Sequence, residues 1–87
     1  MKQLPEMPRL NRRFRMQWEE AQQAHVLLYP EGMVRLNQSA AEILQCCDGA
    51  TTVDDIVAQL ERKFNASGLR NDIVGLLAHA LEKDWIQ

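Results

Sequence analysis

The chain has 87 residues, of which 46% are hydrophobic and 25% are charged, and these values are typical of one small soluble globular domain. Its formal net charge of -2 gives no overall attraction to phosphate, so nucleic acid is not the default partner. No run of about 18 apolar residues could span a bilayer and no apolar secretion signal opens the chain, so we expect a cytoplasmic protein without a membrane partner.

The first twelve residues are expected to lie outside the folded domain. Residues 1–12 contain Pro5, Pro8 and scattered charges without a steady period, which indicates a flexible N-terminal arm. A single folded domain is then expected over residues 13–87.

Three short strands are predicted in the first half of the chain. Apolar and polar residues alternate over residues 14–18, which is the period of a strand with one buried face formed by Phe14, Met16 and Trp18. Two further β-favouring runs cover residues 25–29 and 33–36. The Pro-Glu-Gly sequence between them predicts a three-residue hairpin loop in which Gly32 takes a positive φ as the bulge residue.

The rest of the chain, from residue 37 on, predicts three helices. Asn37 or Ser39 can cap the first helix, and Thr52 can cap the second. The third helix should cover about residues 69–83, with Ser67 as its cap.

Three short antiparallel strands followed by three α-helices predict an α+β fold with a winged helix-turn-helix-like arrangement. The first two helices each carry one ordinary apolar stripe, whereas the third has a wider apolar arc of about 160°. A ligand site would explain this arc, and so would packing against both other helices and the strands. The apolar residues of the third helix are Leu69, Ile73, Val74, Leu76, Leu77, Ala80 and Leu81.

Catalytic and metal-binding chemistry has little support in the sequence. His25 and His79 have no partner at a spacing that shares a metal ion, and the adjacent Cys46 and Cys47 lack the C-x-x-C gap. No glycine-rich phosphate loop follows a strand. We therefore predict that the protein is not an enzyme and that it needs no metal and no cofactor. Both thiols are expected to be reduced, with Cys47 serving helix packing and Cys46 as a partly exposed structural thiol.

Some helix-turn-helix scaffolds bind DNA and others bind proteins, so the surface chemistry must decide between these two functions. A recognition helix brings basic and amide side chains to DNA, whereas the third helix offers Arg70, Asn71 and Lys83 beside acidic residues. A winged-helix DNA-binding regulator is therefore kept as the alternative function. A redox protein or a carrier would require Cys46 or Ser39.

One basic cluster lies near the N-terminus, and it consists of Arg9, Arg12, Arg13 and Arg15. It either docks an acidic partner surface or belongs to a solvated arm. An exposed strand edge beside an apolar helix suits a different partner, because an extended peptide can pair with such an edge as an additional strand.

The most specific sequence feature is the turn between the second and third strands, together with the helix start that follows it. The quoted residues are Leu27-Leu28-Tyr29-Pro30-Glu31-Gly32, Val34, Leu36-Asn37, Ala40, Ile43-Leu44, Asp48-Gly49, Thr52 and Ile56. This ordered set resembles the pyrroloquinoline quinone (PQQ) biosynthesis protein D family, PqqD, and the likeness covers about residues 8–87. The family often ends its last helix with glycine, where this chain has Asp84.

The resemblance implies a peptide chaperone that makes no bonds itself. It implies binding of the precursor peptide PqqA and its delivery to the radical SAM enzyme PqqE, by a monomer or a weak homodimer. The precursor is implied to add as a strand along residues 33–36, with its side chains facing the third helix. The implied peptide-binding residues are Met33, Val34, Arg35, Leu36, Leu69, Ile73, Val74, Leu77 and Leu81.

Overall fold

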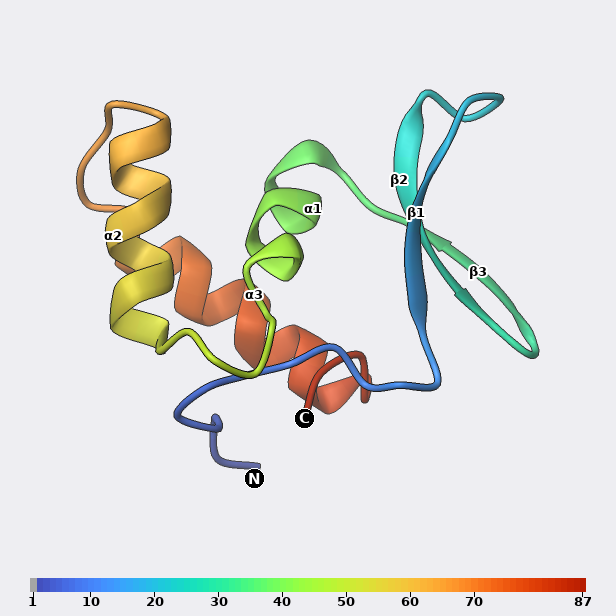
Figure 1. The fold of residues 1–87 in the computed structure, drawn as a ribbon, viewed down its shortest axis with the longest axis horizontal. Coiled ribbons are helices and arrows are strands. Elements are labelled where there is room, and N and C mark those ends of the chain that lie inside the picture. The colour runs from blue at the N-terminus through green and yellow to red at the C-terminus, as the bar shows by residue number, and fades with distance from the viewer. Residues whose placement is uncertain (1) are drawn as a thin grey trace.

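The computed structural model describes residues 2–87 and contains three strands followed by three helices (Figure 1). Its elements are β1 (Arg15–Glu19), β2 (Ala24–Tyr29), β3 (Gly32–Arg35), α1 (Gln38–Gln45), α2 (Val53–Lys63) and α3 (Arg70–Glu82). The predicted α+β class and the winged helix-turn-helix-like order of strands and helices are confirmed. No helix in the described part of the chain is long and apolar enough to cross a membrane.

The three strands form an antiparallel sheet with β2 in the middle. The turn between β2 and β3 has only two residues, because Tyr29 pairs directly with Gly32. The expected three-residue loop is therefore wrong, and Gly32 does not take a positive φ. The glycine instead leaves room for an aromatic ring, since a Cβ atom on Gly32 would lie 3.3 Å from Tyr29 Oη.

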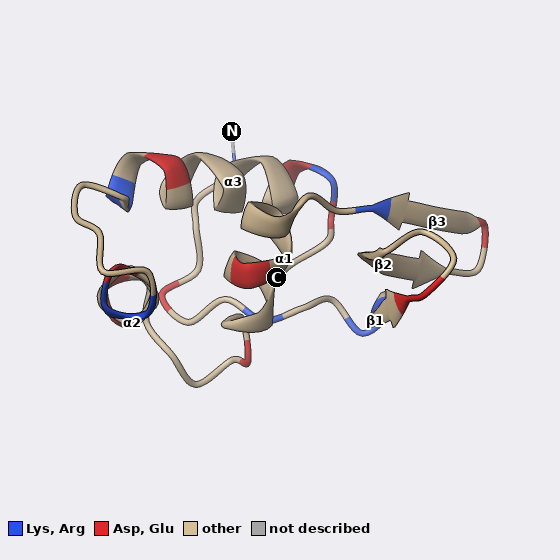
Figure 2. Ribbon diagram, turned by 90° about the horizontal axis from the view of Figure 1, so that it is seen from above, with Lys and Arg blue, Asp and Glu red and all other residues tan. Residues whose placement is uncertain are grey.

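One face of the sheet packs against the helices. Met16, Leu27 and Val34 are cross-strand neighbours on this face, and Leu27 is completely buried. Both views place all three helices on the same side of the sheet (Figures 1 and 2), and α1 is the helix that contacts β2. We call the opposite side the open face; strand alternation assigns to it Arg15, Gln17, Glu19, Ala24, Val26, Leu28, Met33 and Arg35.

The alternation predicted for β1 holds at Met16 but not at Trp18. Met16 is half-buried against the core, whereas Trp18 is 49% exposed. The Trp18 ring meets the His25 ring edge-on at 5.2 Å, and its indole N–H donates to Glu20. Trp18 therefore covers the end of the sheet instead of entering the core.

The helix starts agree with the expected caps in two cases out of three. The Asn37 side chain accepts a hydrogen bond from the N–H of Ala40 at the start of α1, and Thr52 caps α2. Ser67 does not cap α3. The N–H of Leu69 instead donates to a carboxylate oxygen of Glu61, at 3.0 Å, so a side chain of α2 caps the next helix.

Two helices end in the same hydrogen-bonded motif without a glycine. Asn65 after α2 and Asp84 after α3 take positive φ values of 50° and 60°. After α3, the N–H groups of Asp84 and Trp85 donate to the carbonyls of Leu81 and Ala80, which is the Schellman pattern. Asp84 thus occupies the position where glycine was expected, and Lys2 forms an ion pair with it at 2.7 Å.

The N-terminal segment differs from the expected arm, because residues 8–11 are part of the fold. The backbones of Arg9 and Gln87 exchange two hydrogen bonds, of 3.0 and 2.9 Å, and Leu10 forms a bridge with Ile86. These contacts join residues from opposite ends of the chain, so no local period signals them. The folded part therefore begins earlier than the expected boundary.

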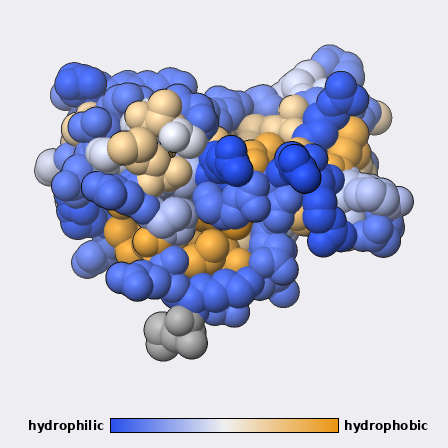
Figure 3. All heavy atoms as spheres, turned by 60° about the horizontal axis from the view of Figure 1, so that its bottom comes forward, coloured by the Kyte–Doolittle hydropathy of each residue, from blue (hydrophilic) through white to orange (hydrophobic). Residues whose placement is uncertain are grey.

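Figure 3 turns the lower side of the view in Figure 1 toward the reader. Hydrophobic residues appear there in separate patches between hydrophilic ones. Scattered apolar surface of this kind is normal for a folded protein and does not indicate a docking face by itself.

The core joins the sheet to the three helices. It contains Leu27, Leu36, Ala40, Ala41, Ile43, Leu44, Cys47, Ile56, Val57, Leu60, Ile73, Leu77, Ala80, Leu81 and Ile86. Leu77 of α3 is completely buried in this cluster, whereas its neighbour Leu76 is partly exposed at the margin. Helix α3 is therefore held mainly by one side of its wide apolar arc.

We predict that replacing Leu77 by alanine lowers the free energy of unfolding by about 2 to 5 kcal/mol, because a buried leucine leaves a cavity. Leu76→Ala, one position away in the same helix, should cost less than half as much. Urea unfolding of both variants measures the difference. Equal losses would contradict the assignment of Leu77 to the centre of the core.

Candidate peptide-binding site

β3 is an edge strand whose outer side has no partner in the described chain. The N–H of Leu36 donates to the carbonyl of His25 at 3.0 Å, and Val34 pairs with Leu27 in the same register. Alternate residues of an antiparallel strand point their backbone groups in opposite directions. The N–H and C=O groups of Met33 and Arg35 therefore point outward and are available to an additional strand.

Helix α3 lies at the level of β3, and the backbones of the two elements are well separated. It runs from the α2 side of the molecule toward the sheet, so its C-terminal half is nearer to β3 (Figures 1 and 2). Within residues 2–87, no Cα atom of β3 comes within 8 Å of a Cα atom of α3. Paired strands lie about 4.8 Å apart, which is less than this separation of the two backbones.

The structure divides the nine predicted site residues into three groups. On β3, Met33 and Arg35 are exposed and Val34 is half-buried. Leu69, which precedes α3, and Val74, on α3, are half-buried, and the residues in the core are Leu36, Ile73, Leu77 and Leu81. The core residues contribute little exposed surface, although Leu36 and Ile73 each line a cavity described below. The apolar period of α3 does not separate the buried centre of its apolar side from the accessible margin.

Leu69 borders an apolar cavity that the sequence did not indicate. The cavity has a volume of about 440 Å³ and lies between the first half of α1 and the adjoining ends of α2 and α3. Its apolar lining includes Ile43, Leu60, Phe64, Leu69 and Ile73. Phe64 is 46% exposed, and its place at the end of the apolar stripe of α2 was the only available signal.

A second cavity, of about 430 Å³, lies between α1 and the end of the sheet. It is lined by polar and aromatic residues that include Trp18, His25, Arg35, Gln38 and Gln45. Sequence patterns did not predict it, because Trp18 was expected to be buried. Since Gln38 also lines the apolar cavity, the two cavities lie on either side of the first turn of α1.

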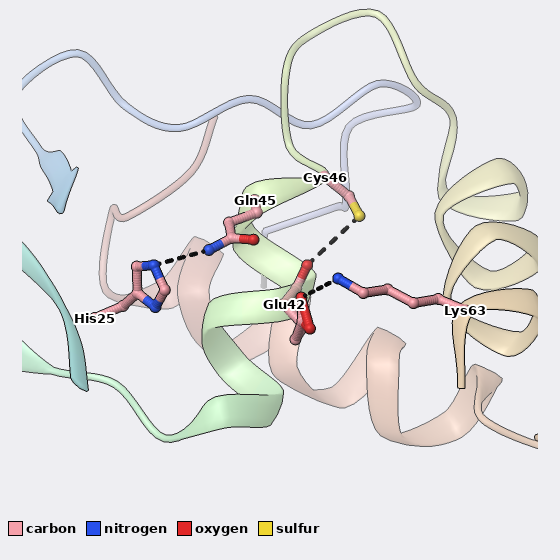
Figure 4. Close-up of polar contacts among 5 residues, drawn as sticks. All are labelled: His25, Glu42, Gln45, Cys46 and Lys63. Carbon is pink, nitrogen blue, oxygen red and sulfur yellow. Dashed lines mark hydrogen bonds and ion pairs between the residues drawn. The ribbon is translucent and has the colours of Figure 1, made fainter. Parts of the chain in front are cut away.

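The polar contacts around α1 connect neighbouring elements (Figure 4). His25 Nε2 lies 3.1 Å from the side-chain nitrogen of Gln45, which joins β2 to α1. Lys63 Nζ lies 2.8 Å from Glu42 Oε1, which joins α2 to α1. Cys46 Sγ donates to the backbone carbonyl of Glu42 at 3.5 Å. The first two contacts hold neighbouring elements together, and the third lies within the last turn of α1.

The two thiols are poor nucleophiles in this setting. Burial raises the pKa of the Cys47 thiol to about 12, and burial is also the main cause that raises the pKa of Cys46. Both groups are therefore protonated near neutral pH, where a reactive cysteine would be a thiolate. Residues 2–87 contain no group of three or more His, Cys, Asp or Glu side chains placed to hold a metal ion.

The DNA-binding alternative gains no support from α3. Arg70, at its first turn, forms an ion pair with Asp54 of α2 at 2.8 Å. Asp72 and Glu82 add negative charge to the same helix. A helix that meets phosphate groups needs the opposite balance.

Comparisons with known proteins agree with these features. Residues 24–86 match the family model described as Coenzyme PQQ synthesis protein D (PqqD). The chain is 55% identical over 73 residues to the PqqA binding protein of Methylococcus capsulatus, across 84% of this chain and 78% of the relative. It is 51% identical over 86 residues to the PqqA binding protein of Stutzerimonas stutzeri, across 98% and 94% of the two chains.

A solved structure has the same fold. It is the solution NMR structure of the PqqD truncation of Methylobacterium extorquens PqqCD, described as a functional, stand-alone recognition element for ribosomally synthesized and post-translationally modified peptides. The TM-score is 0.77 at 33% sequence identity, over 92% of this chain and 87% of that chain. The family model, the relatives and this structure together establish that the chain belongs to the PqqD family.

Proposed function

We propose that the protein binds the precursor peptide PqqA in PQQ biosynthesis and presents it to the radical SAM enzyme PqqE without making or breaking bonds itself. The observation that carries this proposal is the unpaired outer edge of β3. The names of the relatives as PqqA binding proteins support the identity of the peptide. Delivery to PqqE rests on the family resemblance, and a monomer or a weak homodimer remains the predicted state.

In the proposed complex, PqqA adds as a fourth strand beside β3. The outward backbone groups of Met33 and Arg35 bond to the peptide, and these bonds do not depend on its side chains. Every second peptide side chain then stands on the same side as Val34, toward α3. Val74, which is half-buried on α3, can contribute apolar surface to this contact. Ile73 and Leu77 anchor the helix in the core.

Two cavities border the first turn of α1, which follows β3 directly. A peptide that continues past Arg35 would reach this region. We assign no peptide residue to either cavity, since strand pairing alone is sufficient for the proposed recognition.

We predict that titration of the isotope-labelled chain with PqqA shifts the amide resonances of residues 33–36 and of α3 most strongly. Pairing should also slow hydrogen exchange at Met33 and Arg35, because their N–H groups leave the solvent. Addition of PqqE to this complex should produce a second set of shifts with the first set retained. Shifts confined to residues 9–15 or to α2 would show that the peptide binds elsewhere.

We predict that Arg35→Pro weakens PqqA binding about threefold to tenfold, because proline removes one outward donor. The hairpin should survive, since this N–H does not face β2 and proline is tolerated on the free side of an edge strand. Val34→Pro is the matched control: it removes a donor that faces β2 and should unfold the hairpin. Calorimetric titration and circular dichroism measure the two effects. Unchanged binding by a folded Arg35→Pro variant would contradict pairing at this position.

We predict that replacing both Cys46 and Cys47 by alanine leaves PqqA affinity within about twofold of the original value, since a binding role needs no thiol chemistry. The buried Cys47 should account for a stability loss of about 1 kcal/mol through lost packing. Thermal unfolding and peptide titration separate the two readouts. A large loss of delivery to PqqE with an unchanged melting curve would assign the thiols a functional role.

A further inference from the structure

The register of the sheet fixes which peptide side chains would meet which side chains of β3. A strand paired with Met33 and Arg35 places its opposing residues on the open face, because cross-strand partners share a face. Its intervening residue stands beside Val34, toward the helices. Two peptide positions, separated by one residue, are therefore read by Met33 and by Arg35.

Arg35 forms no ion pair in the described chain, and Glu42, which lines the same cavity as Arg35, is paired with Lys63. Arg35 is exposed, and the ion pairs within residues 2–87 involve other residues. Across the sheet, Arg35 pairs with Val26, which is completely buried, and Val26 pairs with Gln17. Within residues 2–87, no strand pairs with β3 on its outer side. Figure 2 marks the end of β3 as basic, on the outer strand of the sheet.

Opposite charges placed directly across paired strands stabilise a sheet, and like charges destabilise it. A guanidinium group also matches a carboxylate in shape, because both can form two parallel hydrogen bonds. Met33 is apolar and 45% exposed. The peptide side chain that lies opposite Met33 therefore has an apolar neighbour instead of a charged one. The two open-face positions therefore favour different side chains.

We infer that Arg35 selects an aspartate or glutamate in the bound peptide, and that the residue two positions away, beside Met33, is apolar. This inference rests on the proposed strand addition along β3. It assigns a sequence preference to an interaction whose backbone hydrogen bonds alone would accept almost any sequence.

The test is a charge exchange. Each Asp and Glu of PqqA is changed singly to Lys, and calorimetric titrations at low salt measure the dissociation constants with the wild-type chain, Arg35→Glu and Arg35→Lys. One of these Lys peptides should bind the wild-type chain at least about fivefold more weakly than PqqA does. The affinity of the same peptide should recover when it is measured with Arg35→Glu. Arg35→Lys should keep the preference of the wild type for the acidic residue.

Arg15→Glu is the matched control, because Arg15 lies on the same open face but on the opposite edge strand. It makes the same change in net charge and should leave the ranking of the peptides unaltered. If Arg15→Glu and Arg35→Glu act alike, or if no Lys peptide recovers on Arg35→Glu, direct pairing at Arg35 is overturned. A wild-type chain that fails to bind PqqA would overturn both this inference and the proposed function, whereas wild-type binding without charge exchange overturns only the inference.

Discussion

The packing of one face of the sheet onto α1 determines how the rest of the molecule is arranged. Leu27 and Leu36 bury this face, and the helices all lie beyond it. A three-stranded sheet covered on one side keeps two free edges and one solvated face. The short connection from β3 into α1 then brings one of those edges close to the helical layer. The accessible backbone of Met33 and Arg35 follows directly from this arrangement.

The nearly neutral total charge conceals an uneven distribution along the chain. Residues 1–37 contain six basic and four acidic residues, whereas residues 38–87 contain four basic and eight acidic ones. The strands and the N-terminal segment are thus the electropositive part of the molecule, and the helices are the electronegative part. At physiological salt such a field extends only about 8 Å, so it acts on groups already close to the sheet. This distribution would orient an acidic segment toward the strands as it approaches.

Features set by neighbouring residues were predictable from the sequence, and features set by distant residues were not. The caps at Asn37 and Thr52 depend on groups three residues away, and both were identified. The cap of α3 comes from Glu61, across a turn, and the N-terminal segment pairs with the C-terminus; neither leaves a local pattern. The same distinction applies to the candidate peptide-binding site. The edge strand could be predicted from the hairpin pattern. The side of α3 that stays accessible depends on how the other helices pack. The second cavity depends on Trp18 lying outside the core.

The two backbone hydrogen bonds between Arg9 and Gln87, and the ion pair between Lys2 and Asp84, hold the N-terminal segment beside the C-terminus on the helical side of the molecule. A protein fused at either end would therefore be anchored at the same place, away from the hairpin turn. The solved relative is itself a truncation of a longer chain, PqqCD. Covalent linkage of this kind holds a second protein at a high effective concentration beside the domain, without requiring an interface between them. The joined termini thus make the fold suitable as a module that can be tethered while the edge of β3 remains open.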